Sequence, residues 1–247
     1  MITIKNEKQI SYMREAGKIL SGLFQELEKV IKPGISTLEL DKIAHAYIIE
    51  HKAKPSFLHY QGFPATLCTS VDDVVVHGIP RADQILQEGQ IIGIDVGAVV
   101  HGYHADAART YAVGNISPEK QKLIDVTKQS FFEGIKNIKE GSRLGDIGGA
   151  VQEYVEKHGF SVVRDLVGHG VGANLHEAPN VPNYGNKGTG MKLVAGMTLA
   201  VEPMVNMGSY AMSFPKEWVC KTRDGLPSAH YENTIVITKT GVEILTL

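Results

Sequence analysis

The chain has 247 residues, of which 43% are hydrophobic and 21% charged, and its formal net charge is -2. This composition is typical of a globular protein that buries a sizeable core, and the weak charge gives no reason to expect nucleic acid or an anionic membrane as the main partner. The first residues lack a basic segment leading into an apolar one, and no apolar run approaches the roughly 20 residues that span a bilayer. Two cysteines are too few for a disulfide framework. We therefore expect a cytoplasmic protein.

The first half of the chain begins with helices and continues with strands. Apolar positions at helical spacing predict a helix over residues 7–31. A second helix over residues 37–52 follows the turn Ile31-Lys32-Pro33-Gly34. Segments rich in β-branched residues and broken by glycine then predict strands at 65–71, 73–77, 90–100 and 104–113.

The second half has the same order. Ser117 as cap and Pro118 at the first helical position begin a helix over residues 118–139, and another is expected over 144–158. Strands are predicted at 162–167, 197–206 and 232–239. Because helices come in pairs and strands in clusters, we predict an α+β fold with the helices on one face of a largely antiparallel sheet.

An internal repeat relates the two halves. The turn that begins at Ile31 and the helix that follows it recur in the second half, from Ile138 to His158. The offset that carries Ile31 onto Ile138 also carries residues 88–95 onto residues 195–202, and it therefore places Asp95 on Glu202. We expect a single domain over residues 1–247, made of two pseudo-symmetric halves of about 1–115 and 116–247, whose equivalent strands each deliver a carboxylate to the centre.

Two aspartates lie on neighbouring predicted strands. Asp95 is in an otherwise apolar strand, Asp106 is in the next, and residues 100–103 between them suit a hairpin turn. Two isolated aspartates are more often ordinary turn or edge carboxylates than ligands. Glu202 and Glu232 are harder to explain in that way, because each adjoins an apolar run and a buried carboxylate requires a cation or hydrogen-bond donors.

His169 completes this set within the glycine-rich segment VGHGVG. A lone histidine in such a segment is more often structural than a ligand. Together, however, four carboxylates and one imidazole suit hard or borderline divalent cations, and the charge of two such ions balances the four carboxylates. Two ions about 3.5–4 Å apart, bridged by shared carboxylates, are the usual arrangement in aminopeptidases and related hydrolases that use two metal ions.

These motifs carry a specific resemblance. The segments DVGAVVHGYHAD, GHGVGANLHEAP, LAVEPM and YENT resemble the type I methionine aminopeptidases of the M24 metallopeptidase family, and the match covers nearly the whole chain. The resemblance implies the pseudo-twofold "pita-bread" fold, with a curved, largely antiparallel sheet and two pairs of helices on its outer face. Type I is favoured because no N-terminal extension is present and because the segment between Glu202 and Glu232 is too short for the inserted helical subdomain of type II enzymes.

The resemblance also implies an activity: removal of the initiator methionine from nascent proteins whose second residue is small. Asp95 would bind one metal ion, His169 and Glu202 the other, and Asp106 and Glu232 both, with Co, Mn, Fe or Zn as the two ions. A hydroxide between the metals would be the nucleophile, with Glu202 as general base and then acid. The implied partners are nascent polypeptides, short peptides and the ribosome, for a monomer that binds neither membranes nor specific nucleic acids.

Two further histidines match catalytic positions of the family. His77, in VVVHGIP, would contact the scissile amide, and His176, in NLHEAP, would stabilise the tetrahedral oxyanion. Each alone is more often an ordinary histidine, and the surrounding motif reverses that expectation. His101, His104 and His230 lie near the ligands but match no functional position.

The family's methionine pocket falls on residues that would otherwise be interpreted as core: Phe57, Tyr60, Phe63, Cys68, Leu175 and Trp218. The chain departs from the common bacterial pattern at three places. Phe57 stands where a cysteine is often found, Leu175 replaces an aromatic residue, and Asn233 stands where a histidine is common. These changes put the pocket shape and inhibitor response in doubt.

Three other functions remain open. A proline-specific aminopeptidase or prolidase uses a similar five-ligand site, although such relatives usually carry an additional N-terminal domain for which this chain has no room. A non-catalytic binding protein on the same scaffold would be expected to have lost ligands. GHGVGAN has the glycine spacing of a nucleotide-binding loop but lacks the strand-to-helix context that would cradle a phosphate.

Overall fold

The computed structural model describes residues 2–216 and 218–247. Its helices are α1 (Glu7–Val30), α2 (Thr37–Glu50), α3 (Pro118–Ile135), α4 (Leu144–Lys157) and the short 3-10 helix η1 (Tyr60–Gly62). Its strands are β1 (Lys54–Pro55), β2 (Cys68–Val71), β3 (Val74–Val76), β4 (Ile91–Val100), β5 (Tyr103–Ala112), β6 (Ser161–Val162), β7 (Gly168–Gly170), β8 (Glu177–Val181), β9 (Thr198–Val201), β10 (Met204–Asn206), β11 (Met212–Ser213), β12 (Cys220–Thr222), β13 (Ser228–His230), β14 (Glu232–Ile237) and β15 (Val242–Ile244).

Local sequence signals explain where the long helices begin. Asn6 and Ser36 each accept a hydrogen bond from the backbone N–H of the third residue that follows, while Gln9 and Glu39 bond back to the cap. Ser117 caps α3 ahead of Pro118. None of the helices in the described residues is both long and apolar enough to span a bilayer.

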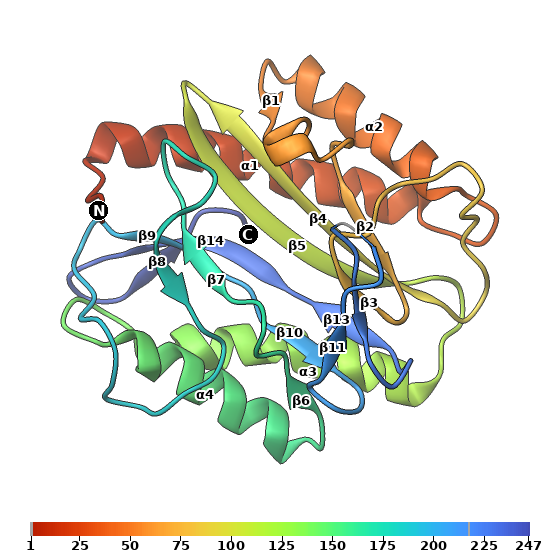
Figure 1. Cartoon of the computed structure of the whole chain (residues 1–247). Coiled ribbons are helices and arrows are strands. Elements are labelled where there is room, and N and C mark those ends of the chain that lie inside the picture. The colour runs from red at the N-terminus through yellow and green to blue at the C-terminus, as the bar shows by residue number, and fades with distance from the viewer. Residues whose placement is uncertain (1, 217) are drawn as a thin grey trace.

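A nine-stranded antiparallel sheet runs through the middle of the molecule. Its main path is β1-β4-β5-β14-β9-β7-β8, with β2 paired to β4 and β15 paired to β14. Two small three-stranded sheets, β13-β10-β6 and β11-β12-β3, lie beside it. Figure 1 shows α1 and α2 along one side of the molecule and α3 and α4 along the opposite side, with the long β4–β5 hairpin and β14 between them.

Helix packing divides the core in two. One buried cluster joins α1 and α2 to β2, β4 and β5, and includes Leu20, Leu23 and Leu40, each fully shielded from solvent. Others join α3 and α4 to β9, β10, β13 and β14, with Phe131 and Val151 at their centres. Both halves of the chain therefore use a helix pair to cover their part of the sheet.

The internal repeat recurs in the backbone. The isolated bridge between Ser36 and Ile85 has a counterpart between Arg143 and Lys192. In the adjoining turns, Gly34 donates to the carbonyl of Leu86 at 2.8 Å, and Gly141 donates to the carbonyl of Leu193 at 2.9 Å. The offset that relates these pairs also carries both ends of α2 onto the ends of α4.

The predicted α+β class and largely antiparallel sheet are confirmed. Three expected elements differ in detail. The strand expected over residues 162–167 is limited to β6, because β6 pairs only with the short strand β10. The strand over 197–206 is split into β9 and β10 at Pro203, which has no N–H to donate to a ladder. The helix over 118–139 ends at Ile135.

Candidate metal centre

Three of the predicted ligands lie side by side on the central sheet. Asp95 of β4 pairs with Ala108 of β5, and Ala108 pairs on its other side with Glu232 of β14. Asp106 lies two positions before Ala108 on β5, so the strand period of two directs its side chain to the same face. The predicted hairpin turn is present: His101 and Gly102, with φ of 50° and 80°, connect β4 to β5.

The other two predicted ligands come from the neighbouring strands. His169 lies on the short strand β7, opposite Ala200 of β9, rather than in a glycine-rich loop. Glu202 directly follows β9. The His169 Nε2 atom is 3.8 Å from Asp106 Oδ2 and 3.7 Å from Glu202 Oε1. The structure therefore brings all five predicted ligands to one place.

The hydrogen bonding of His169 prepares it to bind a cation. Its Nδ1 lies 2.9 Å from the carbonyl oxygen of Gly170, which can only accept, so Nδ1 carries the proton. Burial, with His176 nearby, lowers the pKa of His169 to about 3, which keeps the ring neutral. A neutral ring protonated at Nδ1 directs the Nε2 lone pair at the carboxylates, as in metal-ligating histidines.

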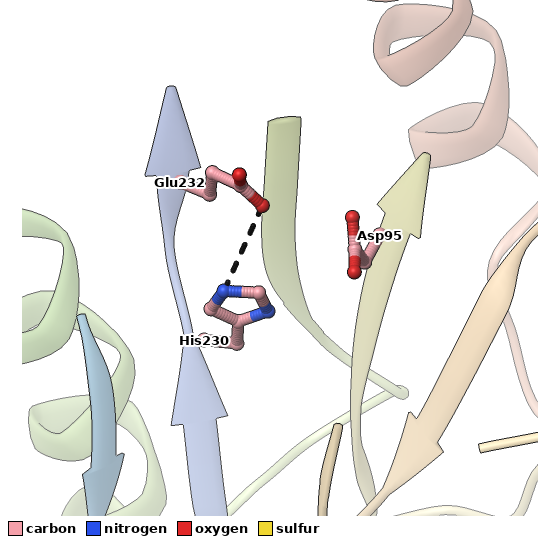
Figure 2. A group of neighbouring side chains, drawn as sticks. All are labelled: Asp95, His230 and Glu232. Atoms are coloured by element: carbon pink, nitrogen blue, oxygen red, sulfur yellow. Dashed lines mark ion pairs between the residues drawn. The ribbon is translucent and has the colours of Figure 1, made fainter. Parts of the chain in front are cut away.

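A sixth residue, His230, joins this group, although its motif position suggested no function. Its Nε2 is 3.7 Å from Glu202 Oε2 and 3.8 Å from Glu232 Oε2, nearly the same separations that His169 shows. Figure 2 shows His230 and Glu232 directed to the same side as Asp95. The one sequence signal for His230 is its place two positions before Glu232 along an extended chain.

The carboxylates lie in an environment that disfavours their charge. Asp106 and Glu232 are 3% and 2% exposed. Burial raises the pKa of Asp106 to about 7. Burial also raises the pKa values of Asp95, Glu202 and Glu232, and repulsion between the neighbouring carboxylates adds to it.

The donor set fits divalent cations. Asp106, His169 and Glu232 offer ligand atoms within 4.8 Å of one another, and Asp95, His230 and Glu232 form a second such group. Buried oxygen atoms of Asp95, Asp106 and Glu232 have no hydrogen-bond partner among the described residues. A buried carboxylate oxygen without a donor is costly, and a shared cation satisfies several at once.

The five predicted ligands line one end of a cavity of about 760 Å³. Another part of the same cavity, its apolar end, contains all six predicted pocket residues in one packed cluster: Phe57, Tyr60, Phe63, Cys68, Leu175 and Trp218. The rings of Phe63 and Trp218 meet edge to face, with centroids 5.6 Å apart. The structure thus joins a hydrophobic recess to the candidate metal centre.

His77 and His176 also line this cavity. His77 has a φ of 60°, a left-handed conformation that is unusual for a residue with a side chain. Its Nδ1 faces the Cys220 sulfur at 3.9 Å. The ring of His176 packs against that of His169 in a tilted arrangement, with ring centroids 4.1 Å apart, and its Nδ1 is 2.8 Å from the hydroxyl of Tyr60.

Three other residues singled out in the sequence lie outside the reactive part of the cavity. The ring of His101 packs on Tyr12, and the Nδ1 atom of His104 is 2.9 Å from the hydroxyl of Ser56. Asn233 does not line the cavity: its side-chain oxygen accepts from Arg109 and Thr246 in the interior. Of the three departures from the common bacterial pattern, only Phe57 and Leu175 therefore act directly on cavity shape.

Comparison with known proteins agrees with this geometry. Residues 11–239 match the model of metallopeptidase family M24. The chain is 53% identical to a methionine aminopeptidase of Clostridium acetobutylicum, covering 100% of this chain and 99% of that protein. It is 50% identical to methionine aminopeptidase 1 of Bacillus subtilis, with the same coverage. The crystal structure of a methionine aminopeptidase from Thermotoga maritima superposes with a TM-score of 0.97 at 45% identity, covering 100% of this chain and 99% of that one.

The likeness to the proline-directed proteins considered above shows the fold alone. A prolidase from Pyrococcus furiosus superposes with a TM-score of 0.77 at 22% identity, and this chain covers 65% of its length. The family match and the full-length relatives together identify the family of this chain. The chain belongs to metallopeptidase family M24 and, within it, to the methionine aminopeptidases.

Proposed function

We propose that this chain hydrolyses the peptide bond after an N-terminal methionine, in nascent proteins or short peptides whose second residue is small. The observation that carries the proposal is the single cavity with two unlike ends. Its apolar end suits a thioether side chain, and its polar end lies where the amino group and scissile bond of that residue would be. The preference for a small second residue is part of the proposal because the resemblance to the methionine aminopeptidases implies it.

The polar end would hold two divalent metal ions drawn from Mn, Fe, Co and Zn. In this assignment Asp95 serves one ion, His169 and Glu202 serve the other, and Asp106 and Glu232 serve both. The buried oxygens without partners and the short spacing of ligand atoms support it. Divalent ions bound there would polarise the scissile carbonyl and lower the pKa of water towards neutrality.

The protein's own groups would supply orientation and proton transfer. Glu202 lines the cavity, and its side chain is 13% exposed, against 4% for Asp106 and 2% for Glu232. We assign it as the group that accepts the proton of the attacking water and delivers it to the leaving amine.

The two cavity histidines have complementary roles in this proposal. Tyr60 fixes the ring of His176 through Nδ1, which leaves Nε2 to donate to the oxyanion of the tetrahedral intermediate. His77, held beside Trp218 with ring centroids 6.4 Å apart, is assigned to the amide nitrogen. Burial lowers the pKa values of both rings, and the nearby His176 adds to the effect on His77, so both are neutral at pH 7.

We also propose that the chain acts as a monomer, because it supplies all five candidate ligands and all six recess residues itself. We also propose that residues 1–247 form one catalytic domain of two similar halves, because bridges and turns of the first half are matched at equivalent positions of the second. Size-exclusion chromatography with light scattering tests the first proposal.

The deciding experiment uses chelated protein reloaded with Mn, Fe or Co, one metal at a time. We expect metal-dependent release of free methionine from Met-Ala-Ser and little cleavage of an Ala-Pro peptide. Equal or faster cleavage before proline would move the assignment to the proline-directed branch. Equal activity before and after chelation, with metal content measured, would remove the metal from the reaction.

A further inference from the structure

The residues before α1 form an N-terminal strap, defined as residues 2–5, that crosses to the second half of the molecule. The Lys5 N–H donates to the carbonyl of Gly196 at 2.9 Å, just before β9. The half-buried side chain of Ile2 packs against the hydrophobic cluster beneath α3 and β14. Figure 1 shows the described residues just before α1 beside the segment leading into β9. The strap thus lies close to the strands that carry His169 and Glu202.

The strap delivers a lysine to a buried carboxylate. The Lys5 Nζ is 2.6 Å from Glu177 Oε2, and the two side chains are only 4% and 6% exposed. The remaining Lys5 donors reach the hydroxyl and carbonyl oxygens of Thr3, and the Thr3 hydroxyl donates to Glu177. All three ammonium protons therefore have acceptors, the condition under which a buried ion pair is well formed.

Glu177 connects this pair to the site. It immediately follows His176, begins β8 and lines the cavity. Its second oxygen accepts the N–H of Asn174 at 3.1 Å, so one carboxylate fixes both ends of the short loop that carries His176. Gly172 leaves room for the contact, because a Cβ there would lie 2.4 Å from Lys5 Cε and 2.7 Å from Glu177 Oε1.

We propose that Lys5 is a positioning residue for hydrolysis: paired with Glu177, it holds the loop that places His176 against the developing oxyanion. This inference rests on the proposed role of His176. Without the ammonium group of Lys5, the Glu177 carboxylate would be a buried charge without a counter-ion. The loop that carries His176 would then shift so that this carboxylate reaches water. His176 is the adjacent residue and would move with it, losing its alignment although Tyr60 still contacts Nδ1.

The test is Lys5→Met, which keeps the aliphatic stem and removes the charge. A displacement of about 1 Å at a catalytic group can lower the rate about 100-fold, so we expect a 10- to 100-fold fall in kcat on Met-Ala-Ser. KM should change less than about threefold, because the methionine recess is untouched. Binding of the phosphonic acid analogue of methionine, whose tetrahedral oxygens need the same donor, should weaken, while binding of free methionine should not.

Adding Glu177→Gln to Lys5→Met removes the unpaired charge and should restore part of kcat. Thr3→Val deletes the hydroxyl that bonds to both Lys5 and Glu177, at nearly constant side-chain volume, and should lower kcat less than Lys5→Met does. It replaces Lys5→Met as the test if that variant does not fold. The matched control is Arg14→Met, which breaks the ion pair of Arg14 with Glu243 away from the cavity and should leave kcat unchanged.

Metal content and melting temperature are measured for every variant, and His176→Ala is assayed in parallel. Normal kcat and phosphonate binding in folded Lys5→Met or Thr3→Val, with His176→Ala impaired, would overturn the inference and leave the role of His176 intact. Normal kcat in His176→Ala would overturn that role and the inference with it.

Discussion

The two ends of the cavity solve opposite physical problems. The apolar end is complete as it stands: Phe57, Phe63 and Leu175 are 8%, 3% and 2% exposed and pack on one another and on Trp218. The metal end packs four carboxylates and two imidazoles into a buried space, where several oxygens have no donor among the described residues. Packing at the apolar end therefore stabilises the folded protein, whereas the buried carboxylates at the metal end destabilise it until cations bind.

The difference separates what each end does. A packed apolar recess selects a side chain by shape, and its discrimination is limited to a few kcal/mol. A cluster of acidic side chains held close together by the sheet gains its stability from the ions that it binds, so binding and folding are linked there. We expect variants at the metal end to change rate and metal-dependent stability together, and variants at the apolar end to change selectivity.

The largest expected effect comes from neutralising a shared ligand. Glu232→Gln keeps the shape of the side chain and removes one negative charge from between the two candidate metal positions. Loss of several kcal/mol of transition-state stabilisation corresponds to a fall in kcat/KM of about 1000-fold. Methionine release from Met-Ala-Ser measures the rate, and mass spectrometry of the metal content measures occupancy. Glu243→Gln, a change of the same kind on the outer strand β15, is the control and should keep its activity. Unchanged activity in Glu232→Gln would contradict the two-metal assignment.

The next effect concerns stability and pH. Burial raises the folded-state pKa of Asp106 to about 7, whereas an unfolded aspartate titrates near about 3.9. The folded, metal-free protein therefore holds a proton that the unfolded chain lacks, and this contribution to stability is lost as pH rises from about 4 to 7. Metal ions replace that proton more easily at high pH. We expect Mn²⁺ to raise the melting temperature more at pH 7.5 than at pH 5.

Thermal unfolding with EDTA or saturating Mn²⁺ checks this expectation. At about 1000 times the dissociation constant, one bound ion adds about 4 kcal/mol to the free energy of unfolding. Asp106→Asn removes the titrating group and one ligand, so its Mn²⁺-induced shift should be smaller and less dependent on pH. A shift that is equal at both pH values in the unmodified protein would show that Asp106 and its neighbours are not the binding groups.

Much of the fold follows from local sequence. Apolar positions at helical spacing, the cap at Ser117 and the internal repeat placed the long helices to within a few residues, except for the C-terminal end of α3. The short strands could not be found in this way. A strand as short as β7 has no periodicity of its own and exists because Gly168 and Gly170 allow β8 and β9 to approach from both sides.

The candidate site divides along the same line. Asp95 and Asp106 became candidates only as members of the five-ligand set, whereas Glu202 and Glu232 were recognisable because an acid beside an apolar run is anomalous by itself. His230 and the Lys5–Glu177 pair were not, because their significance depends on contacts between residues far apart in the chain. Lys5 and Glu177 are 172 positions apart. An ordinary lysine before a helix gives no local sign that it is buried.

The smallest expected effect belongs to the apolar end and tests whether it acts by shape alone. Phe57→Leu should widen the recess, lower kcat/KM for N-terminal methionine, and improve the relative cleavage of an N-terminal phenylalanine. The change in preference should be about 10-fold, within the roughly 1–3 kcal/mol that an apolar pocket provides. Paired peptides that differ only in the first residue measure this change in preference.

Phe131→Leu, at a fully buried phenylalanine of α3, is the matched control: it should lower stability without altering preference. If both substitutions shifted preference equally, selectivity would reflect global loosening rather than the recess around Phe57. If only Phe57→Leu did so while Mn²⁺-dependent stabilisation stayed unchanged, the two ends of the cavity would be separable, one serving selection and the other chemistry.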